Sequence, residues 1–375
     1  MNKPLGGVRV IELAGIGPGP YAGQLLADMG AEVILVNRPG PMGMIPNLSH
    51  RGKKTITLDL RKPEGAEIVL DLVRSADVLF EGLRPGVTER LGVGPEACHA
   101  VNPKLVYGRM TGWGQTGPWA KTAGHDINYI SITGALGAMG RAGTPPSPPL
   151  NLVGDYGGGS LFLVAGILAA LFQAERTGKG EIVDAAIIDG TNSMMSILHL
   201  LSGLGRWTPE RGTNMLDGAW PFYRCYATKD EKFMAVGPLE PQFFAEMLRL
   251  LEIDKVEYGA QMDKSKFPQQ HALLEAKFAE KTREAWADIF NGTDACVTPV
   301  LTYDEAPSHP QNAARGGLRR QGTFVHPRPA PGFSGMETDP DFSVPGASDD
   351  AAAVFGELGY DAAKLETLRS AGVIG

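Results

Sequence analysis

The sequence is poor in the residues that build metal centres and disulfide frameworks. Its 375 residues include only three cysteines, Cys98, Cys225 and Cys296, which are far apart and form no CxxC pair. The seven histidines form no HExxH pattern. Zinc sites and disulfide scaffolds need closely spaced groups, whereas widely spaced cysteines are typical of reduced thiols. We therefore expect no metal site and no disulfide bond.

The sequence also lacks an excess of positive charge and a long apolar segment. Its 35 Lys and Arg residues are outnumbered by 42 Asp and Glu residues, which argues against a nucleic-acid partner. The longest apolar run, Leu161–Phe172, is shorter than the roughly 20 residues of a membrane-spanning helix. Residues 1–4 lead directly into a predicted strand, without the apolar core of a signal peptide. These features predict a cytoplasmic enzyme with no nucleic-acid or membrane partner.

What the sequence does contain is an alternation of strand and helix patterns in its first half. Helical spacing of apolar residues follows the first strand at residues 21–29 and recurs at 63–75. Strands separated by helices predict a parallel sheet covered on both faces, which is an α/β, Rossmann-like fold. The predicted strands are residues 8–13, 32–36, 77–80, 105–107 and 181–188.

The composition changes after residue 202 and predicts further parts of the chain. Residues 203–220 are rich in Gly, Arg, Thr and Pro, as in a linker. Residues 221–302 combine a hairpin pattern, three helical patterns and a strand, which predicts a small α+β domain. Residues 303–375 predict an extended return segment and C-terminal helices that pack on the large domain at 1–202.

Two candidate proton-transfer groups stand beside glycines at the predicted starts of helices. His125 follows Gly124, and Asp155 is followed by three glycines at 157–159. A helix start disfavours the imidazolium, so a histidine there can accept a proton near neutral pH. Capping explains either residue taken alone, but three glycines are costly in a helix start and allow a backbone to approach a ligand. A base, an acid and anion-holding N–H groups together can form and reprotonate an enolate.

Glu240 is a third candidate, at the start of a helical pattern in the predicted small domain. Pro241 suits the first helical position, which makes Glu240 the N-cap, where Ser, Thr, Asp or Asn would serve better. A poor cap indicates another role, such as orienting a histidine, as the third member of a catalytic triad does. An exposed surface carboxylate remains the alternative at this point.

The glycine-rich loop at residues 15–21 and the end of the second strand indicate a bound nucleotide. The loop follows a strand and precedes a helix, but the third glycine of GxGxxG would fall on Pro20. Arg38 stands where a dinucleotide-binding protein reads the ribose, and Arg suits a phosphorylated ribose. NADP and coenzyme A both carry one, and the broken glycine spacing favours coenzyme A. A solvated surface cation remains the alternative for Arg38.

Six segments of the chain, in the same order along the sequence, resemble the α-methylacyl-CoA racemases of the family III CoA-transferase superfamily. The resemblance implies an isomerase that interconverts (2R)- and (2S)-2-methylacyl-CoA thioesters through an enolate, with His125 and Asp155 as acid/base groups and Glu240 as the partner of His125. It also implies an interlocked homodimer with the active site at the subunit interface. No cofactor is implied, because coenzyme A is part of the substrate. The segments are Ala14–Pro20, Met110–Pro118, Gly124–Ile130, Asn151–Asp155, Asn214–Gly218 and Asp294–Val300.

The same resemblance assigns coenzyme A contacts to strand ends and to the segment around His125. Arg61 stands where lysine is common, which keeps the charge but changes the geometry of phosphate binding. The backbone N–H of Asp155 is the expected donor to the enolate oxygen. The residues expected to contact the substrate are Ile16, Arg38, Leu58, Asp59, Leu60, Arg61, Gly82, Leu83, Arg84, Arg90, Gly124, Asp126, Ile127, Asn128 and Tyr129.

Three other functions compete with racemisation at this stage. A CoA-transferase of the same superfamily would use Asp155 as the nucleophile that attacks the thioester, but it needs no base at the α-carbon, so His125 with Glu240 favours the racemase. An NADP-dependent oxidoreductase fits Arg38 but not the glycine spacing. A non-catalytic acyl-CoA-binding protein requires both His125 and Asp155 to be inert.

Overall fold

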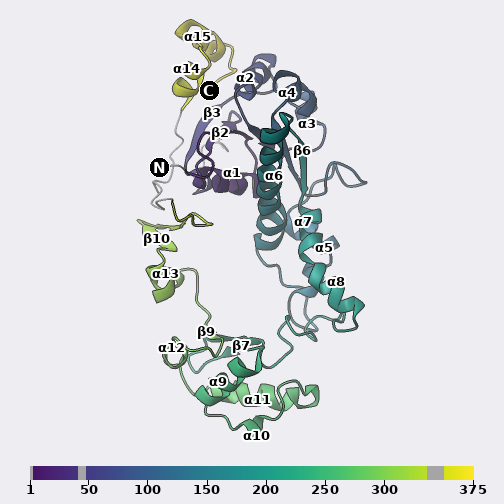
Figure 1. Cartoon of the computed structure of the whole chain (residues 1–375), viewed down its shortest axis with the longest axis vertical. Coiled ribbons are helices and arrows are strands. Elements are labelled where there is room, and N and C mark those ends of the chain that lie inside the picture. The colour runs from purple at the N-terminus through teal and green to yellow at the C-terminus, as the bar shows by residue number, and fades with distance from the viewer. Residues whose placement is uncertain (1–2, 41–47, 336–349) are drawn as a thin grey trace. The chain divides into compact units, whose positions relative to one another are not determined.

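The chain forms two compact units, each of which is described here by itself (Figure 1). The computed structural model describes residues 3–40, 48–335 and 350–375. Unit 1 comprises Met1–Ala135, Pro149–Ser196 and Gly316–Gly375, and unit 2 comprises Leu136–Pro148 and Ile197–Arg315. Unit 1 is therefore built from three separate segments of the chain.

Six parallel strands form the sheet of unit 1, in the order β3-β2-β1-β4-β5-β6. Strand β1 pairs with β2 on one side and with β4 on the other, so the strand order reverses between β1 and β4. This is the order of a Rossmann-like sheet, and it confirms the predicted α/β fold. The strands are β1 (Arg9–Leu13), β2 (Glu32–Asn37), β3 (Lys53–Thr57), β4 (Val78–Glu81), β5 (Val106–Thr111) and β6 (Ile182–Ala186).

Strand β3 does not follow from the sequence pattern, because Ile56 is its only apolar residue. Lys53 on this strand is nevertheless buried. Its Nζ donates to Glu12 Oε2 at 2.6 Å and to the Pro20 carbonyl at 2.9 Å. Strand β3 therefore joins the sheet through backbone pairing with β2 and a buried ion pair with β1, although it lacks the alternating apolar residues that a sequence pattern requires.

Gly23 in helix α1 (Pro18–Asp28) leaves room for this ion pair. A Cβ at Gly23 would lie 1.9 Å from Glu12 Oε2 and 2.7 Å from Lys53 Nζ. Gly23→Ala should therefore open the buried pair and lower the free energy of unfolding by about 3–5 kcal/mol, measured by denaturant titration. Gly356→Ala is the matched control, because a Cβ there meets nothing within 4 Å and alanine favours a helix. Equal stability of the two variants would contradict the expectation.

Helices cover both faces of this sheet. One face, with Ile11 and Ile34, packs against α2 (Pro63–Val73), α4 (Pro95–Val101) and the C-terminal helices α14 (Ala351–Glu357) and α15 (Ala362–Ser370). The other face, with Val10 and Val33, packs against α1 and α6 (Leu161–Thr177). Residues 350–375 therefore complete a core cluster of unit 1, with Val354 and Phe355 fully buried.

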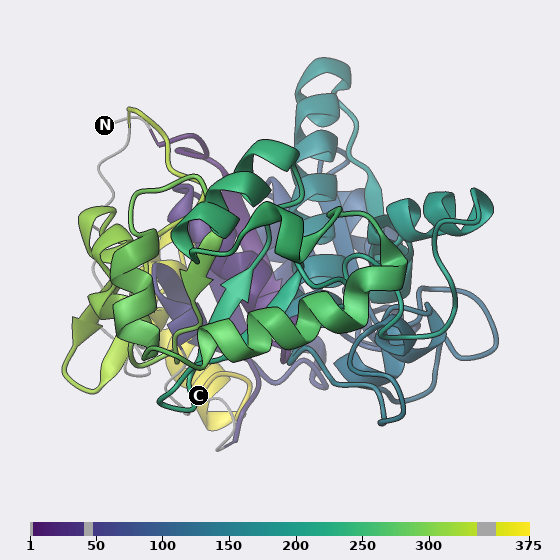
Figure 2. The same cartoon turned by 90° about the horizontal axis from the view of Figure 1, so that it is seen from below.

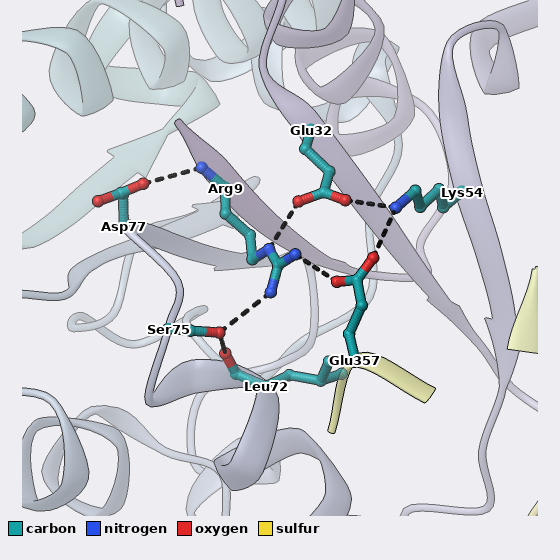
Figure 3. Close-up of polar contacts among 7 residues, drawn as sticks. All are labelled: Arg9, Glu32, Lys54, Leu72, Ser75, Asp77 and Glu357. Carbon is teal, nitrogen blue, oxygen red and sulfur yellow. Dashed lines mark hydrogen bonds and ion pairs between the residues drawn. The ribbon is translucent and has the colours of Figure 1, made fainter. Parts of the chain in front are cut away.

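An ion-pair network attaches α14 to the first three strands (Figure 3). Arg9 Nε donates to Glu32 Oε2 at 2.6 Å, and Arg9 Nη2 donates to Glu357 Oε2 at 2.5 Å. Lys54 Nζ reaches the other oxygen of each carboxylate, at 2.5 Å for Glu32 and 3.2 Å for Glu357. Because both cations bridge both carboxylates, the network joins β1, β2 and β3 to the same C-terminal helix.

The chain before α6 forms a π-helical segment, η4 (Leu152–Ser160), that runs directly into α6. Together they make a helix of 26 residues, Leu152–Thr177, which is long and apolar enough to cross a membrane by length and composition. The apolar run Leu161–Phe172 alone had indicated a shorter element. Leu163 and Ile167 are fully buried in the core beside the sheet, and core helices of soluble proteins meet the same criterion.

Unit 2 contains a three-stranded antiparallel sheet in the order β7-β8-β9, covered on one face by helices (Figure 2). The hairpin and the third strand were both predicted. Tyr226, Met234 and Trp286 are among its fully buried side chains. The elements are β7 (Arg224–Ala227), β8 (Phe233–Val236), β9 (Val297–Pro299), α9 (Pro241–Leu250), α10 (Lys255–Tyr258), α11 (Phe267–Phe278) and α12 (Arg283–Phe290).

Residues 203–220 hold a hydrogen-bonded turn where a linker was expected. The Asp217 carboxylate accepts the backbone N–H groups of Gly212, Thr213 and Asn214 at 2.8–3.2 Å. The expected extended segment after residue 303 likewise contains short elements. The remaining helices and strands are α3 (Val87–Arg90), α5 (Asp126–Ile132), α7 (Ile187–Met194), α8 (Ser196–Gly203), α13 (Pro310–Ala314), β10 (Leu318–Gln321) and β11 (Phe324–Pro327).

Candidate active site

The residues predicted to hold coenzyme A follow the carboxyl ends of the parallel strands. Ile16 follows β1, Arg38 follows β2, residues 58–61 follow β3 and residues 82–84 follow β4, while Arg90 lies in the next helix, α3. Because the carboxyl ends of parallel strands meet at one edge of a sheet, these segments share that edge. Ligands of Rossmann-like sheets bind there, where the strand order reverses.

A cavity of about 510 Å³ opens at this edge and lies wholly within unit 1. Its walls come from the β1–α1 loop, the loop after β4, the segment from Met110 to Tyr129, and the π-helical segment. His125 and Asp155 line the same cavity although 30 residues separate them in sequence. The predicted residues that line it are Ile16, Gly82, Leu83, Arg84, Gly124, His125, Tyr129 and Asp155.

The other predicted coenzyme A contacts lie outside the lining of this cavity. Arg38, Arg61 and Arg90 are exposed cations. Arg61 binds the Asp59 carboxylate with two nitrogens, each at 2.8 Å, which lowers the pKa of Asp59 to about 2. The side chain of Leu58 belongs to the core, and its backbone N–H donates to the Asn37 carbonyl at 2.9 Å. The remaining residues of this group are Leu60, Asp126, Ile127 and Asn128.

His125 is the N-cap residue of α5, as the sequence predicted. Its backbone N–H donates to Asn128 Oδ1 at 3.1 Å, which fixes the start of the helix. The helix ends at Ile132, two residues before Gly134, which takes a positive φ of 82° that does not continue a right-handed helix. The His125 residue is exposed at the mouth of the cavity, where a substrate can reach the ring.

Asp155 lies in the π-helical segment η4, a type of helix that recurs at functional sites. The pKa of Asp155 is raised to about 6. Burial is the largest cause, and the neighbouring Asp126 carboxylate acts in the same direction. A hydrogen bond from Asn151 and the nearby His125 act in the opposite direction. The Asp155 carboxyl can therefore both release and accept a proton near neutral pH.

The backbone N–H of Asp155 is already paired inside the protein. It donates to Asp126 Oδ2 at 2.7 Å. The expectation that this N–H holds the enolate oxygen is therefore wrong, because its hydrogen is directed at a buried carboxylate. Asp126 itself is buried, which the sequence did not indicate, because a carboxylate at a helix start is usually exposed.

The glycines near Asp155 serve contacts of the chain with itself. A Cβ on Gly158 would lie 2.5 Å from Thr191 Oγ1, and a Cβ on Gly190 would lie 2.0 Å from the Gly158 carbonyl oxygen. The backbones of η4 and α7 are therefore in direct contact. Gly17, with a φ of 69°, lies against the Asp155 carboxylate. A Cβ on Gly17 would be only 2.8 Å from Asp155 Oδ2. The three glycines after Asp155 thus allow close helix packing, whereas the sequence had suggested the approach of a ligand.

A buried charge network behind the loop after β4 did not emerge from the sequence patterns. Glu81 Oε2 accepts the Leu83 N–H at 2.6 Å, and Glu81 Oε1 accepts Arg109 Nε at 3.1 Å. Arg109 Nη1 also donates to Glu89 Oε1 at 2.8 Å. Burial raises the pKa of Glu81 to about 7. The available signal was a charged residue in each of two apolar strands, Glu81 in β4 and Arg109 in β5, which the structure makes register partners.

Glu240 is the N-cap of α9, as predicted, and its side chain forms no capping hydrogen bond. It follows β8 in unit 2. Burial raises the pKa of the Cys296 thiol, and the nearby Glu240 carboxylate raises it further. Glu240 and His125 belong to different units, so their pairing stays a prediction. Among the described residues, no group of three His, Cys, Asp or Glu side chains is arranged to hold a metal ion.

Comparison with known proteins agrees with this arrangement. A family model described as CoA-transferase family III matches residues 5–350. Alpha-methylacyl-CoA racemase of Mus musculus is 44% identical over 368 residues, which is 98% of this chain and 96% of the mouse protein. The Homo sapiens protein of the same name is 42% identical over 372 residues, which is 99% of this chain and 97% of that protein. The crystal structure of a CAIB/BAIF family protein from Brucella suis is similar with a TM-score of 0.81 and 28% identity, covering 96% of this chain and 100% of that one.

Proposed function

This chain belongs to CoA-transferase family III, and we propose that it is a racemase that interconverts (2R)- and (2S)-2-methylacyl-CoA thioesters by 1,1-proton transfer through an enolate. The isomerase activity follows from relatives at 42–44% identity over nearly the whole chain, which are named alpha-methylacyl-CoA racemases. The observation that carries the proposal is that His125 and Asp155 line one cavity at the carboxyl edge of the sheet.

The proposed reaction moves one proton off C2 and returns another to the opposite face. For one enantiomer His125 removes the α-proton and a protonated Asp155 delivers its own; for the other enantiomer the roles are reversed. Both starting states hold one proton between the two groups, so a single pH range suits both directions. A pKa of about 6 for Asp155 supports this exchange of roles, because neither state is rare near neutral pH. No cofactor is needed in this scheme.

Coenzyme A would supply binding energy away from the reacting carbon. The cations Arg38 and Arg84 at strand ends and Arg90 in α3 are exposed and suit its phosphates. Arg84 also lines the cavity that contains His125 and Asp155. Such remote contacts fix the acyl group against the two proton-transfer groups and so raise the rate of the chemical step.

Arg38→Ala is expected to weaken binding of coenzyme A by about 1.5–3 kcal/mol and to leave binding of 3′-dephospho-coenzyme A nearly unchanged. The reason is that Arg38 follows β2, where ribose substituents are read in this fold. Isothermal titration of both ligands measures the difference. Arg74→Ala, an exposed arginine paired with Asp71 at the end of α2, is the control. Equal losses for both ligands would show that Arg38 does not contact the 3′-phosphate.

The competing transferase reaction has less support. It needs Asp155 as a nucleophile, yet it gives no role to a histidine in the same cavity. The relatives that match nearly all of the chain at more than 40% identity carry the racemase name. The transferase would form an acyl anhydride on Asp155 and would exchange no α-proton.

We also propose that the enzyme is a cytoplasmic homodimer with its active site at the subunit interface. In unit 1, helix α6 exposes three large apolar side chains, Leu161, Phe162 and Phe172. A second subunit that covers this face would bury it. This arrangement would also allow Glu240 of one subunit to reach the cavity of the other.

The direct test of the proposed function is proton exchange in D₂O. Incubation of the purified enzyme with either enantiomer of a 2-methylacyl-CoA should give both enantiomers, each carrying deuterium at C2. Mass spectrometry after chiral separation measures this result. Transfer of coenzyme A to a free carboxylic acid without α-exchange would establish the transferase instead.

A further inference from the structure

We propose that Asp126 is a positioning residue of the proton-transfer site, which joins the helix that carries His125 to the π-helical segment that carries Asp155 and places a negative charge beside the Asp155 carboxyl. The resemblance had assigned Asp126 to coenzyme A binding. The inference rests on the proposed function, because it concerns how the two proton-transfer groups work together. It assigns Asp126 no direct contact with the substrate.

The position of Asp126 supports this role. It is the residue after His125 and the first residue of α5, so the peptide bond fixes its distance from His125. Its Oδ2 accepts the backbone N–H of Asp155 at 2.7 Å. Asp126 therefore connects both reacting residues, through its backbone peptide bond to His125 and through its side-chain hydrogen bond from Asp155.

The surroundings of Asp126 are closed to a large ligand. The residue is 8% exposed, and among the described residues its Oδ1 is buried without a hydrogen-bond partner. A Cβ on Gly154 would lie 2.4 Å from Oδ2 and 3.0 Å from Ile130 Cγ2, so glycine is needed at position 154. A buried carboxylate without its full set of donors is costly, which indicates that its charge serves the site next to it.

The titratable groups near Asp155 come from several elements. At the start of α5, Asp126 raises and His125 lowers the pKa of Asp155. The Asp155 carboxylate in turn helps to raise the pKa of Tyr129, which burial raises most. Helix α1 contributes Tyr21, whose ring lies against Tyr156. The groups on the remaining neighbours are engaged elsewhere: Arg109 of β5 binds Glu81 and Glu89, and Asp189 of α7 faces Asp184 of β6. Asp126 is therefore the carboxylate that acts on Asp155 most directly.

The charge of Asp126 has a definite sign of effect. A neighbouring negative charge stabilises the protonated form of Asp155, in the same direction as burial, and its pKa stands at about 6. Removal of the charge should therefore let Asp155 ionise at lower pH. Racemisation needs one proton shared between His125 and Asp155, so activity is lost on the acid side when both are protonated. Without the charge of Asp126, this acid limb should move to lower pH.

Asp126→Asn separates charge from geometry, because the amide oxygen can still accept the Asp155 N–H. We expect the acid limb of the kcat profile for racemisation to move down by roughly one pH unit, with KM within about twofold of wild type. Asp189→Asn is the control, since it makes the same chemical change on α7, which packs on the same π-helical segment, and Asp189 is not among the groups that shift the pKa of Asp155. It should leave the profile unchanged. An unchanged acid limb in Asp126→Asn would overturn the proposal.

Gly154→Ala tests the geometry with the charge retained, and it keeps the proposal testable if Asp126→Asn does not fold. The added Cβ must displace the Asp126 carboxylate. We expect kcat to fall by at least about tenfold while affinity for coenzyme A is retained, because misplaced acid/base groups lose much of their effect. Wild-type kcat in this variant would overturn the proposal. Absence of α-exchange in the wild-type enzyme would refute the proposed function itself and is read in a separate experiment.

Discussion

Alanine in place of His125 or Asp155 is expected to abolish racemisation while leaving coenzyme A binding within a few-fold of wild type. Each group handles the α-proton on one face of the enolate, and a positioned acid or base contributes about 10²–10⁴-fold to such a step. Racemisation needs both groups, so each single variant should lose the reaction. The phosphates would be held by arginines at the strand ends, which neither substitution touches.

The exchange of the α-proton distinguishes the two variants from each other. The group that remains can still remove a proton from one enantiomer and return deuterium to the same face. His125→Ala should therefore exchange one enantiomer with retention, and Asp155→Ala the other. Deuterium at C2 of recovered substrate, measured separately for each enantiomer, shows this handedness. Racemisation within a few-fold of wild type in either variant would eliminate the two-base mechanism.

Glu240→Gln is expected to slow racemisation strongly with little change in KM. If Glu240 bonds the His125 ring, it orients the ring and stabilises the imidazolium that forms after proton removal, an interaction made chiefly in the transition state. Steady-state kinetics of the variant measures the split between kcat and KM. Glu246→Gln is a control on the same helix, because Glu246 is engaged with Arg249 on the helix surface. Near-wild-type activity of Glu240→Gln would leave Glu240 as a surface cap.

Mixed dimers test whether Glu240 acts across subunits. His125→Ala and Glu240→Ala proteins are each expected to be inactive, and subunit exchange should give mixed dimers. If Glu240 reaches the partner's cavity, one of the two sites in each mixed dimer carries neither change, and about a quarter of wild-type activity should return. If each site is built within one chain, every site keeps its own lesion and no activity returns.

Much of the fold could be predicted because its elements follow simple local patterns. Apolar, β-branched stretches predicted five of the six strands of the large sheet, and the hairpin and helices of unit 2 also followed from periodicity. His125 and Asp155 could be found because glycines and predicted helix starts mark their positions. The structure brings both to one cavity, as their shared chemistry required.

What sequence patterns did not predict depends on contacts between distant residues. Strand β3 is held by the buried pair of Lys53 and Glu12, which are 41 positions apart. The role of Asp126 depends on a hydrogen bond from Asp155, 29 positions away. Neither contact leaves a periodic signal, because each depends on charged side chains, which a propensity scale assigns to the surface.

The π-helical geometry around Asp155 was missed for a related reason. A wide helical turn has no sequence signature of its own, and its glycines indicated ligand approach. They are explained by α7, whose Gly190 meets the backbone of Gly158. The glycines of the π-helical segment are thus required by the close packing of α7. The periodicity of residues within the π-helical segment cannot reveal this contact.

The division of unit 1 into three chain segments affects the order in which the protein can be assembled during synthesis. Its core cluster needs Val354 and Phe355, and its ion-pair network needs Glu357. All of unit 2 lies earlier in the chain than these residues. The ribosome therefore completes unit 2 while one apolar face of the first strands is covered by α2 and α4 but not yet by the C-terminal helices. A nascent chain must keep that face from aggregating until the C-terminal helices emerge.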